Sequence, residues 1–209
     1  MNRRIAGLAV IVLVLGLMLS GRAAGATAVA DAETIARVES YMNALTTLRA
    51  RFVQVAQDGG VSEGTLYMMR PGRLRIEYAP PSQVLMVADG VMLTYVDREI
   101  GQISQMPLSE TPAGVLVGEK LRLSGDITVS EITHDAAIVR VTLTRTRDPD
   151  AGALTLVFTE KPFDLRQWIV VDPQGFSTRV TLFDARRGLP LNPALFATPA
   201  PIPSADEGR

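Results

Sequence analysis

Apolar runs alternate with turn signals between residues 65 and 90, and this stretch carries the clearest structural pattern in the chain. Pro71-Gly72 and Pro80-Pro81 divide it, because proline removes a backbone donor and glycine tolerates positive φ. Between these breaks, apolar and charged residues alternate from Leu74 to Tyr78, which is typical of a strand with one buried and one wet face. The pattern predicts three consecutive antiparallel strands. Their shared apolar face would carry Leu66, Met68, Leu74, Ile76 and Tyr78.

Short apolar segments separated by turn residues continue through most of the remaining chain. Asp58-Gly59-Gly60 and Asp89-Gly90 are hairpin signals. His134-Asp135 and residues 148–150 are predicted turns between later strands. About ten or eleven strands are expected in total, and an antiparallel sheet of that size must curl or close because large twisted sheets rarely stay flat. We therefore expect a mainly β fold.

Two amphipathic segments are predicted to be helical. The first covers residues 31–45, with Asp31 as the N-cap, and its apolar residues recur at intervals of three and four: Ile35, Val38, Met42 and Leu45. The second starts at Thr111-Pro112, and its apolar residues are Val115, Leu116 and Val117. Either helix could pack on the sheet as ordinary core or close over a ligand cavity. Periodicity does not distinguish these alternatives.

Residues 1–30 have the order of a cleaved secretory signal. Arg3 and Arg4 precede a nearly pure apolar run, and Ala28-Val29-Ala30 is a small-x-small cleavage site. The apolar run is shorter than the roughly 20 residues that a membrane-spanning helix needs. We expect cleavage after Ala30 and a protein exported by general secretion, with an uncleaved N-terminal anchor as the alternative.

Charge and cysteine content narrow the function classes. Without the three arginines of residues 1–30, the formal net charge changes from −1 to −4, with 18 basic and 22 acidic residues, so no nucleic-acid partner is expected. The chain has no cysteine, which excludes both disulfides and a lipidated cysteine after the signal. A core large enough to be stable without disulfides is therefore expected, in one domain.

Residues that could support catalysis are sparse. His134 is the only histidine, and no nucleophile-elbow, Walker or dinucleotide motif occurs. His134 is predicted in a polar turn without a carboxylate cluster, which is not a metal site. We expect no enzyme, no cofactor and no bound metal.

Arg70 is the charged residue that the pattern makes unusual. Period two places it on the same side as Leu66 and Met68, where a guanidinium needs hydrogen-bond partners to offset its loss of hydration. Alternatively, Arg70 ends its strand and extends to water along its apolar stem.

The order and spacing of several short motifs resemble the LolA family of periplasmic lipoprotein carriers, over essentially all of residues 31–201. The residues that carry this resemblance are Phe52-Val53-Gln54, Glu63-Gly64-Thr65-Leu66, Met69-Arg70-Pro71, Leu74, Tyr78, Pro80-Pro81, Val87-Ala88-Asp89-Gly90, Tyr95, Thr111-Pro112, Asp172-Pro173-Gln174-Gly175, Phe196 and Pro199. The ending at residues 196–199 follows the family only loosely, which leaves an extra C-terminal strand in doubt.

The resemblance implies an incomplete, strongly curved antiparallel β-barrel with helices forming a lid over an apolar cavity for acyl chains. The implied ligand-binding residues are Phe52, Leu66, Met68, Leu74, Ile76, Tyr78, Met86, Leu93 and Tyr95. The implied lid-closing residues are Arg70, Ile35, Val38, Met42, Val115 and Leu116. In the family, the arginine of the Arg-Pro pair holds the empty cavity closed, and it corresponds to Arg70 here. Leu74 corresponds to an apolar residue near the cavity mouth that is usually aromatic.

The same resemblance implies domains, partners and location. The expected organisation is a signal peptide over residues 1–30, a carrier domain over residues 31–201 and a flexible tail over residues 202–209. The expected carrier is a periplasmic monomer that takes lipoproteins from an inner-membrane ABC transporter to an outer-membrane acceptor. Chain length and the missing lipidation cysteine argue against the acceptor LolB, which has a similar fold. A lipid- or lipoprotein-sensing regulator on this scaffold, or a structural β-protein with a filled core, are the alternatives.

Overall fold

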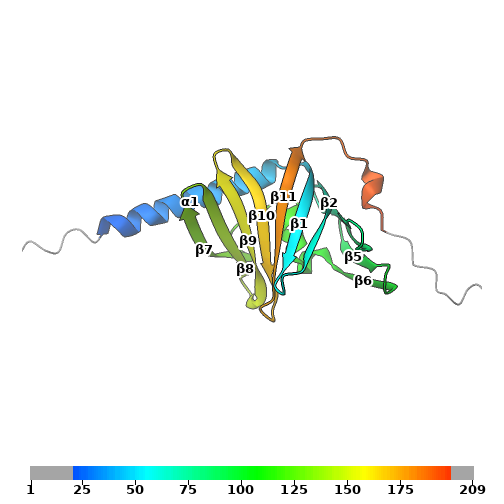
Figure 1. The fold of residues 1–209 in the computed structure, drawn as a ribbon. Coiled ribbons are helices and arrows are strands. Elements are labelled where there is room, and N and C mark those ends of the chain that lie inside the picture. The colour runs from blue at the N-terminus through cyan, green and yellow to red at the C-terminus, as the bar shows by residue number, and fades with distance from the viewer. Residues whose placement is uncertain (1–20, 199–209) are drawn as a thin grey trace, which may run out of the picture. The chain divides into compact units, whose positions relative to one another are not determined.

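The computed structural model describes residues 21–198, with side chains from residue 31 onward (Figure 1). The predicted tail lies outside these residues, as does most of the predicted signal segment. The helical elements are α1 (Gly21–Ala44), η1 (Leu108–Glu110), α2 (Pro112–Val117) and η2 (Pro193–Phe196). The strands are β1 (Thr47–Ala56), β2 (Val61–Met69), β3 (Arg73–Tyr78), β4 (Val84–Asp89), β5 (Met92–Asp97), β6 (Gln102–Pro107), β7 (Ile127–Asp135), β8 (Ile138–Arg145), β9 (Asp148–Glu160), β10 (Phe163–Val171) and β11 (Ser177–Arg187).

All eleven strands form one antiparallel sheet in the order β6-β5-β4-β3-β2-β1-β11-β10-β9-β8-β7. Sequence neighbours pair along each half, and the two halves meet where β1 pairs with β11. Strands β6 and β7 are not paired with each other, so the sheet curls without closing (Figure 1). The connection between them carries η1 and α2. The prediction of a mainly β, unclosed antiparallel fold is confirmed.

One face of the sheet, here called the inner face, carries most of the core. Alternation along β1 and β2 places Phe52, Leu66 and Met68 on it, all 2% exposed or less. The other half contributes alternating residues of β8 and β9 in the same way. These are Val139, Val141, Leu143, Leu154, Leu156 and Phe158, none more than 4% exposed. The period-two pattern of the sequence therefore corresponds to the inner and outer faces of the sheet.

The chain divides into two compact units, Met1–Ala36 and Arg37–Arg209, and α1 contributes to both. Within the described residues the helix covers Gly21–Ala44, so the prediction of a helix that begins at an Asp31 N-cap was wrong. The alanine-rich sequence before Asp31 has high intrinsic helix propensity, which lets the helix continue through it. Among the helices of residues 21–198, none combines the length and the apolar character that crossing a membrane requires.

Two predicted turns lie inside strands. His134 and Asp135 end β7 and pair with Val139 and Ile138 of β8, which leaves only residues 136–137 for the turn. Residues 148–150 begin β9, beside an irregularity in the β8–β9 register where a proline is tolerated. Polar residues flank tight two-residue turns as readily as they form longer ones, which explains both errors.

Gly64 is required by close packing. It lies between Phe52 and Tyr78 in the sheet register, and the two rings meet edge to face with centroids 5.2 Å apart. A Cβ at this position would lie 2.0 Å from the Glu77 carbonyl oxygen and 2.8 Å from the Phe52 ring. The strands cannot accommodate a side chain here without separating.

We predict that Gly64→Ala lowers the free energy of unfolding by about 3 kcal/mol, because the new methyl group meets backbone that cannot move aside. Urea denaturation followed by tryptophan fluorescence measures the change. The matched control is Gly60→Ala, whose Cβ meets only the Asp58 side chain, and its effect should stay within about 0.5 kcal/mol. Equal stabilities of the two variants would contradict the packing argument.

Candidate functional site

The nine predicted ligand-binding residues all lie on the inner face of the β1–β5 half. Strand register arranges them in three rows. One row joins Phe52 to Tyr78 across Gly64. The next runs Leu66–Ile76–Met86–Tyr95, and the last runs Met68–Leu74–Ala88–Leu93. The structure therefore brings the nine predicted ligand-binding side chains together on one face.

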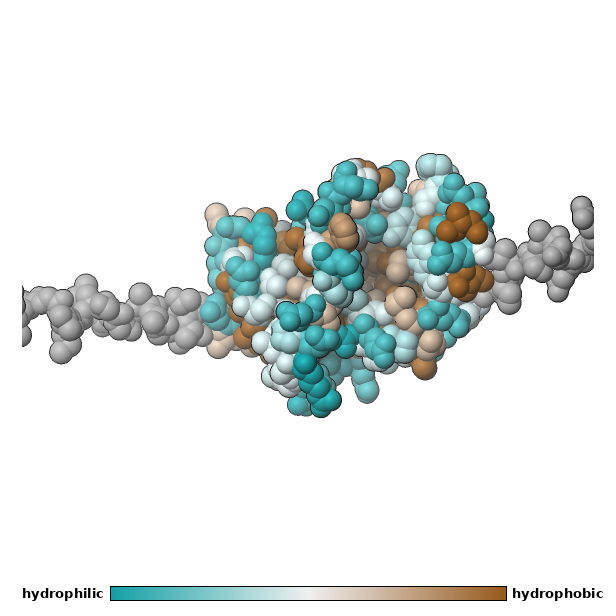
Figure 2. Space-filling model, turned by 90° about the horizontal axis from the view of Figure 1, so that it is seen from below, coloured by the Kyte–Doolittle hydropathy of each residue, from teal (hydrophilic) through white to brown (hydrophobic). Residues whose placement is uncertain are grey.

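Burial differs between two groups of these residues. Phe52, Leu66, Met68, Leu74 and Leu93 are at most 4% exposed. Ile76, Tyr78, Met86 and Tyr95 are half-buried. The surface seen in Figure 2 is hollowed between hydrophilic rims, with hydrophobic residues toward the back. The half-buried group is therefore the part of these rows that is accessible to solvent.

Two tyrosines give this region a polar border. The Tyr78 hydroxyl donates a hydrogen bond of 2.7 Å to Gln54 Oε1, and the Tyr95 hydroxyl lies 3.5 Å from Asp97 Oδ2. Burial is the main cause that raises the pKa of both phenols. Both groups therefore stay neutral at ordinary pH and can donate hydrogen bonds. An apolar ligand with a polar end suits such a surface.

Arg70 fastens the inner face to α2. Its Nε and Nη2 donate hydrogen bonds of 3.1 and 2.7 Å to the carbonyl oxygen of Gly118, the C-cap of α2. Its Nη1 is buried without a hydrogen-bond partner among the described residues. Burial lowers the pKa of Arg70, so the guanidinium is held at a cost in hydration. The alternative in which Arg70 extends to water is wrong.

The helix α2 is attached by a few other contacts. Thr111 caps it by accepting a hydrogen bond from Gly114 N, and the Val117 carbonyl accepts one of 2.7 Å from Gly72 N. Of the predicted lid residues, Leu116 is buried and Val115 is half-buried. Sequence reasoning did not assign a site role to Val117, fully buried, or to Gly118. A glycine directly after an apolar helical segment is the signal that could have located this C-cap.

Two of the predicted lid residues, Val38 and Met42, lie in the segment Arg37–Ala44 of α1, and both are fully buried. Ile35, the third residue predicted on this helix, belongs to the first compact unit. Side chains of this segment also bind the backbone that follows α2. Asn43 pairs with both N and O of Leu121 at 2.8 and 3.0 Å, and Glu39 Oε1 accepts from Leu123 N at 2.6 Å. Helix and loop are thus joined by three hydrogen bonds.

Tyr41 lies at the centre of a polar cluster that joins this segment to the other half of the sheet. Its hydroxyl donates a 2.6 Å hydrogen bond to Asp164 Oδ1 and accepts one of 2.8 Å from Arg187 Nη1. Arg187 also pairs with the buried Asp164. Burial and the Asp164 hydrogen bond raise the pKa of Tyr41, which keeps the donor protonated. Sequence analysis could not find this cluster, because 123 residues separate Tyr41 from Asp164.

Ring contacts strengthen the same attachment. Tyr41 meets Phe158 and Phe163 edge to face at 5.4 and 6.0 Å, and these two phenylalanines stack at 4.7 Å. The Arg37 guanidinium lies over Phe163 and forms a 3.0 Å ion pair with Glu160. The C-terminal part of α1 is therefore held by buried polar and aromatic contacts together.

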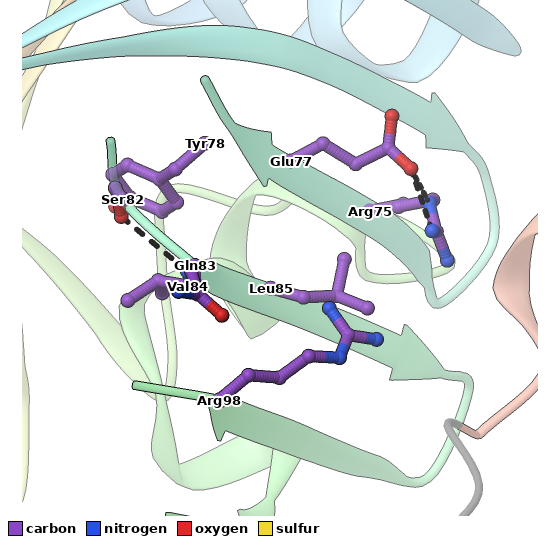
Figure 3. A pocket seen from close by; sticks show the side chains of 8 residues that line it. All are labelled: Arg75, Glu77, Tyr78, Ser82, Gln83, Val84, Leu85 and Arg98. Carbon is purple, nitrogen blue, oxygen red and sulfur yellow. Dashed lines mark hydrogen bonds and ion pairs between the residues drawn. The ribbon is translucent and has the colours of Figure 1, made fainter. Parts of the chain in front are cut away.

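A pocket of about 330 Å³ lies over β3–β5 (Figure 3). Its lining is largely polar and consists of Arg75, Glu77, Tyr78, Ser82, Gln83, Val84, Leu85 and Arg98. Arg75 pairs with Glu77 and also donates to the Leu195 carbonyl of η2 at 3.0 Å. Alternation in the register places Arg75, Glu77 and Leu85 on the outer face. This pocket therefore lies partly on the outer face and meets the rows of inner-face residues at Tyr78, and its charged lining does not suit acyl chains.

His134 does not lie in a turn but on β7, with Nδ1 3.8 Å from Glu160 Oε1. Glu160 in turn pairs with Arg37. Within residues 21–198, no three His, Cys, Asp or Glu side chains gather in the way that a metal ion needs. The acidic and basic groups named above form structural pairs.

Known proteins share both the sequence pattern and the fold. Residues 43–199 match the family described as "Outer membrane lipoprotein carrier protein LolA". The outer-membrane lipoprotein carrier protein of Leptothrix cholodnii is 27% identical over 85% of this chain and 88% of its own. That of Chromobacterium violaceum is 27% identical over 86% and 89%. A DUF1329 family protein from Desulfovibrio piger has the same fold, with a TM-score of 0.50, 11% identity and coverage of 78% and 95%.

An unclosed antiparallel sheet with one apolar face does not by itself define a function, and the family match supplies the class of protein, a binding protein. The chain belongs to the LolA family, whose members are lipoprotein carriers. The resemblance inferred from its motifs is confirmed. Membership in a family of carriers also confirms that the chain is a binding protein and not an enzyme.

We predict that Tyr41→Phe lowers the free energy of unfolding by about 1–2 kcal/mol, because Asp164 loses a donor in a buried site while the ring contacts remain. Chemical denaturation measures the change. Tyr67→Phe is the control, since Tyr67 interacts with Arg49 through its ring, and this variant should match the parent chain. Equal effects of both substitutions would show that the Tyr41 hydroxyl contributes nothing.

Proposed function

We propose that this protein is a periplasmic carrier that binds the acyl chains of lipoproteins on its inner face and moves them from the inner to the outer membrane. Two features together carry the proposal. Nine mostly apolar side chains share one face of the sheet, and Arg70 binds the C-cap of α2 beside them. The names of the relatives support the carrier class.

The energetics of acyl binding explain why such a carrier needs a latch. Removal of each CH₂ group from water stabilises the complex by about 0.8 kcal/mol, so a long chain binds tightly. Release is fast enough only if closure of the empty site competes with the ligand. Arg70 supplies competition, because its two hydrogen bonds to Gly118 exist only while α2 lies against the β2–β3 turn.

In this proposal Arg70, Val115 and Leu116 belong to the part of the lid that opens. The hydrogen bonds that join α2 to the β2–β3 turn are those of Arg70 and Gly72 to residues 117–118, and opening must also expose the buried Leu116 and Val117. Val38 and Met42 close the site from α1, where the Tyr41 cluster holds the helix in place. The ligand would enter when α2 leaves and the Gly118 carbonyl exchanges Arg70 for water.

Domain organisation, location and partners follow from the same proposal. Residues 1–30 direct export and are removed, so the exported protein begins at Asp31, which mass analysis of its N-terminus can check. The carrier domain covers residues 31–201. It receives lipoproteins from an inner-membrane ABC transporter and delivers them to an outer-membrane acceptor, as a monomer.

We predict that Met86→Glu weakens binding of a palmitoylated fluorescent lipopeptide by about tenfold or more, because the acyl chain would bury an unpaired carboxylate. Met86 is half-buried, so the variant should fold. The control is Ile169→Glu, also half-buried but on the outer face opposite Arg179, and it should bind like the parent. Equal binding by all three proteins would place the acyl site elsewhere.

We predict that Arg70→Leu retains bound lipoprotein about tenfold longer and transfers little of it to acceptor, because loss of the latch populates the open, binding-competent state. Retention and transfer are measured with purified acceptor. Arg73→Leu removes an exposed arginine from the start of β3 and serves as the control, with normal transfer. Weakened retention by Arg70→Leu would instead indicate direct contact between Arg70 and the ligand, as in a sensor.

A further inference from the structure

The two edge strands of the sheet differ in how they are protected. Strand β6, Gln102–Pro107, contains no charged residue, and five of its six residues are exposed. Its only proline is its last residue. Natural proteins usually protect exposed edges with charges, prolines within the strand, bulges or a covering segment, because a free edge pairs with other extended chains. Strand β6 has none of these devices along its length.

Strand β7, at the opposite edge, has several of them. Its register with β8 is interrupted between Val129 and Glu131, which marks a bulge or irregularity. Charged groups lie on the strand at Glu131 and Asp135, and Asp135 pairs with Arg140. A bulge twists the edge away from a flat partner and a charge resists burial against one. The absence of protection is therefore specific to β6.

The register indicates which backbone groups of β6 point outward. Leu108 N donates to Val91 O at 2.9 Å, directly beyond the β5–β6 pairs. The direction of the backbone N–H and C=O groups alternates along an antiparallel strand. The backbone groups of Met106 and Ser104 therefore also point to β5, and those of Gln105 and Ile103 point away from the sheet. In the part of the chain that the structure describes, no strand pairs with that outward side.

The edge is continuous with the apolar inner face. Met106 pairs with Leu93, which ends the row Met68–Leu74–Ala88–Leu93. Met106 is 41% exposed, so the row reaches the surface at β6. A polypeptide whose acyl chains lie on the inner face could leave the site along this edge, already extended and within hydrogen-bonding reach.

We propose that the polypeptide of an acylated cargo protein, just beyond its lipid-bearing residue, adds to β6 as a further antiparallel or parallel strand. The inference rests on the proposed function, since the acyl chains bring the peptide to this edge. Main-chain hydrogen bonds from Ile103 and Gln105 supply affinity with little dependence on cargo sequence. The edge thus recognises peptide backbone where the inner face recognises lipid.

Backbone parity provides the test. The probe is a synthetic peptide of about ten residues with two palmitoyl chains on its first residue. One derivative carries N-methyl groups on the backbone amides of its odd-numbered residues, and a second derivative carries them on those of its even-numbered residues. Only one set of amides can face β6, because alternate groups of a strand point to opposite sides. One derivative should bind the full-chain protein about tenfold more weakly than the unmethylated probe, and the other within about twofold. Equal affinities of the two derivatives would overturn the inference.

A variant pair tests the protein side. Gln105→Pro removes the outward N–H while the bonds to β5 remain, and an edge strand tolerates such a proline. Gln105→Ala keeps the N–H and, like the proline, loses the side-chain bond to Thr94. We expect Gln105→Pro to bind the lipopeptide about tenfold more weakly than Gln105→Ala, with equal affinity for dipalmitoyl-glycerol. Equal lipopeptide affinities would overturn the inference.

The remaining outcomes separate this inference from the proposed function. Failure of the parent chain to bind either acyl probe contradicts the proposed function itself. Normal binding of both acyl probes without any effect of methylation or of Gln105→Pro contradicts strand addition alone. Native mass spectrometry that shows a dimer, lost in Gln105→Pro, would assign β6 to a second copy of this chain and also overturn the inference. The expected species is a monomer with one lipopeptide.

Discussion

A sheet that carries its core on one face must have that face covered, and this sheet does not close to cover it. Strands β6 and β7 remain unpaired, so the inner rows that include Leu66, Met68 and Leu74 depend on helical segments to exclude water. That dependence makes the cover separable from the sheet. In the proposed carrier, the same apolar surface is buried either by these helical segments or by an acyl chain, and the two compete.

The two helical segments of the cover are attached with different strength. The Arg37–Ala44 segment of α1 combines the Tyr41–Asp164–Arg187 cluster with ring contacts to Phe158 and Phe163. The α2 segment is joined to the β2–β3 turn by hydrogen bonds to the carbonyl oxygens of Val117 and Gly118, and its Leu116 and Val117 side chains are buried. In the proposed carrier, α2 is the element that leaves the sheet, and the Tyr41 cluster keeps the C-terminal part of α1 in place while the sheet stays folded.

The outer face is covered in another way. Leu85, Val87 and Val96 form a small apolar cluster on β4 and β5, and η2 lies against β3 and β4 with Phe196 buried. Arg75 binds the Leu195 carbonyl and Thr198 binds Asp89, which fixes this end of the chain. The outer face of β4 is thus covered from near the C-terminal end of the described sequence, and only the inner face is proposed to open.

Local pattern determined much of this protein. The alternation around Leu74 and Ile76 is visible in the sequence because side-chain direction in a strand depends only on neighbouring residues. It placed five of the nine expected ligand residues on one face, and it showed that Arg70 needs a partner there or must reach water. The turns at His134 and Asp148 were misplaced, because polar residues mark the neighbourhood of a tight turn but not its register. Tertiary structure alone decided that the partner of Arg70 is the Gly118 carbonyl, 48 residues away, and that Tyr41 meets Asp164. Such contacts depend on how the sheet curls, and no local periodicity encodes the distance between segments that meet only after it has curled.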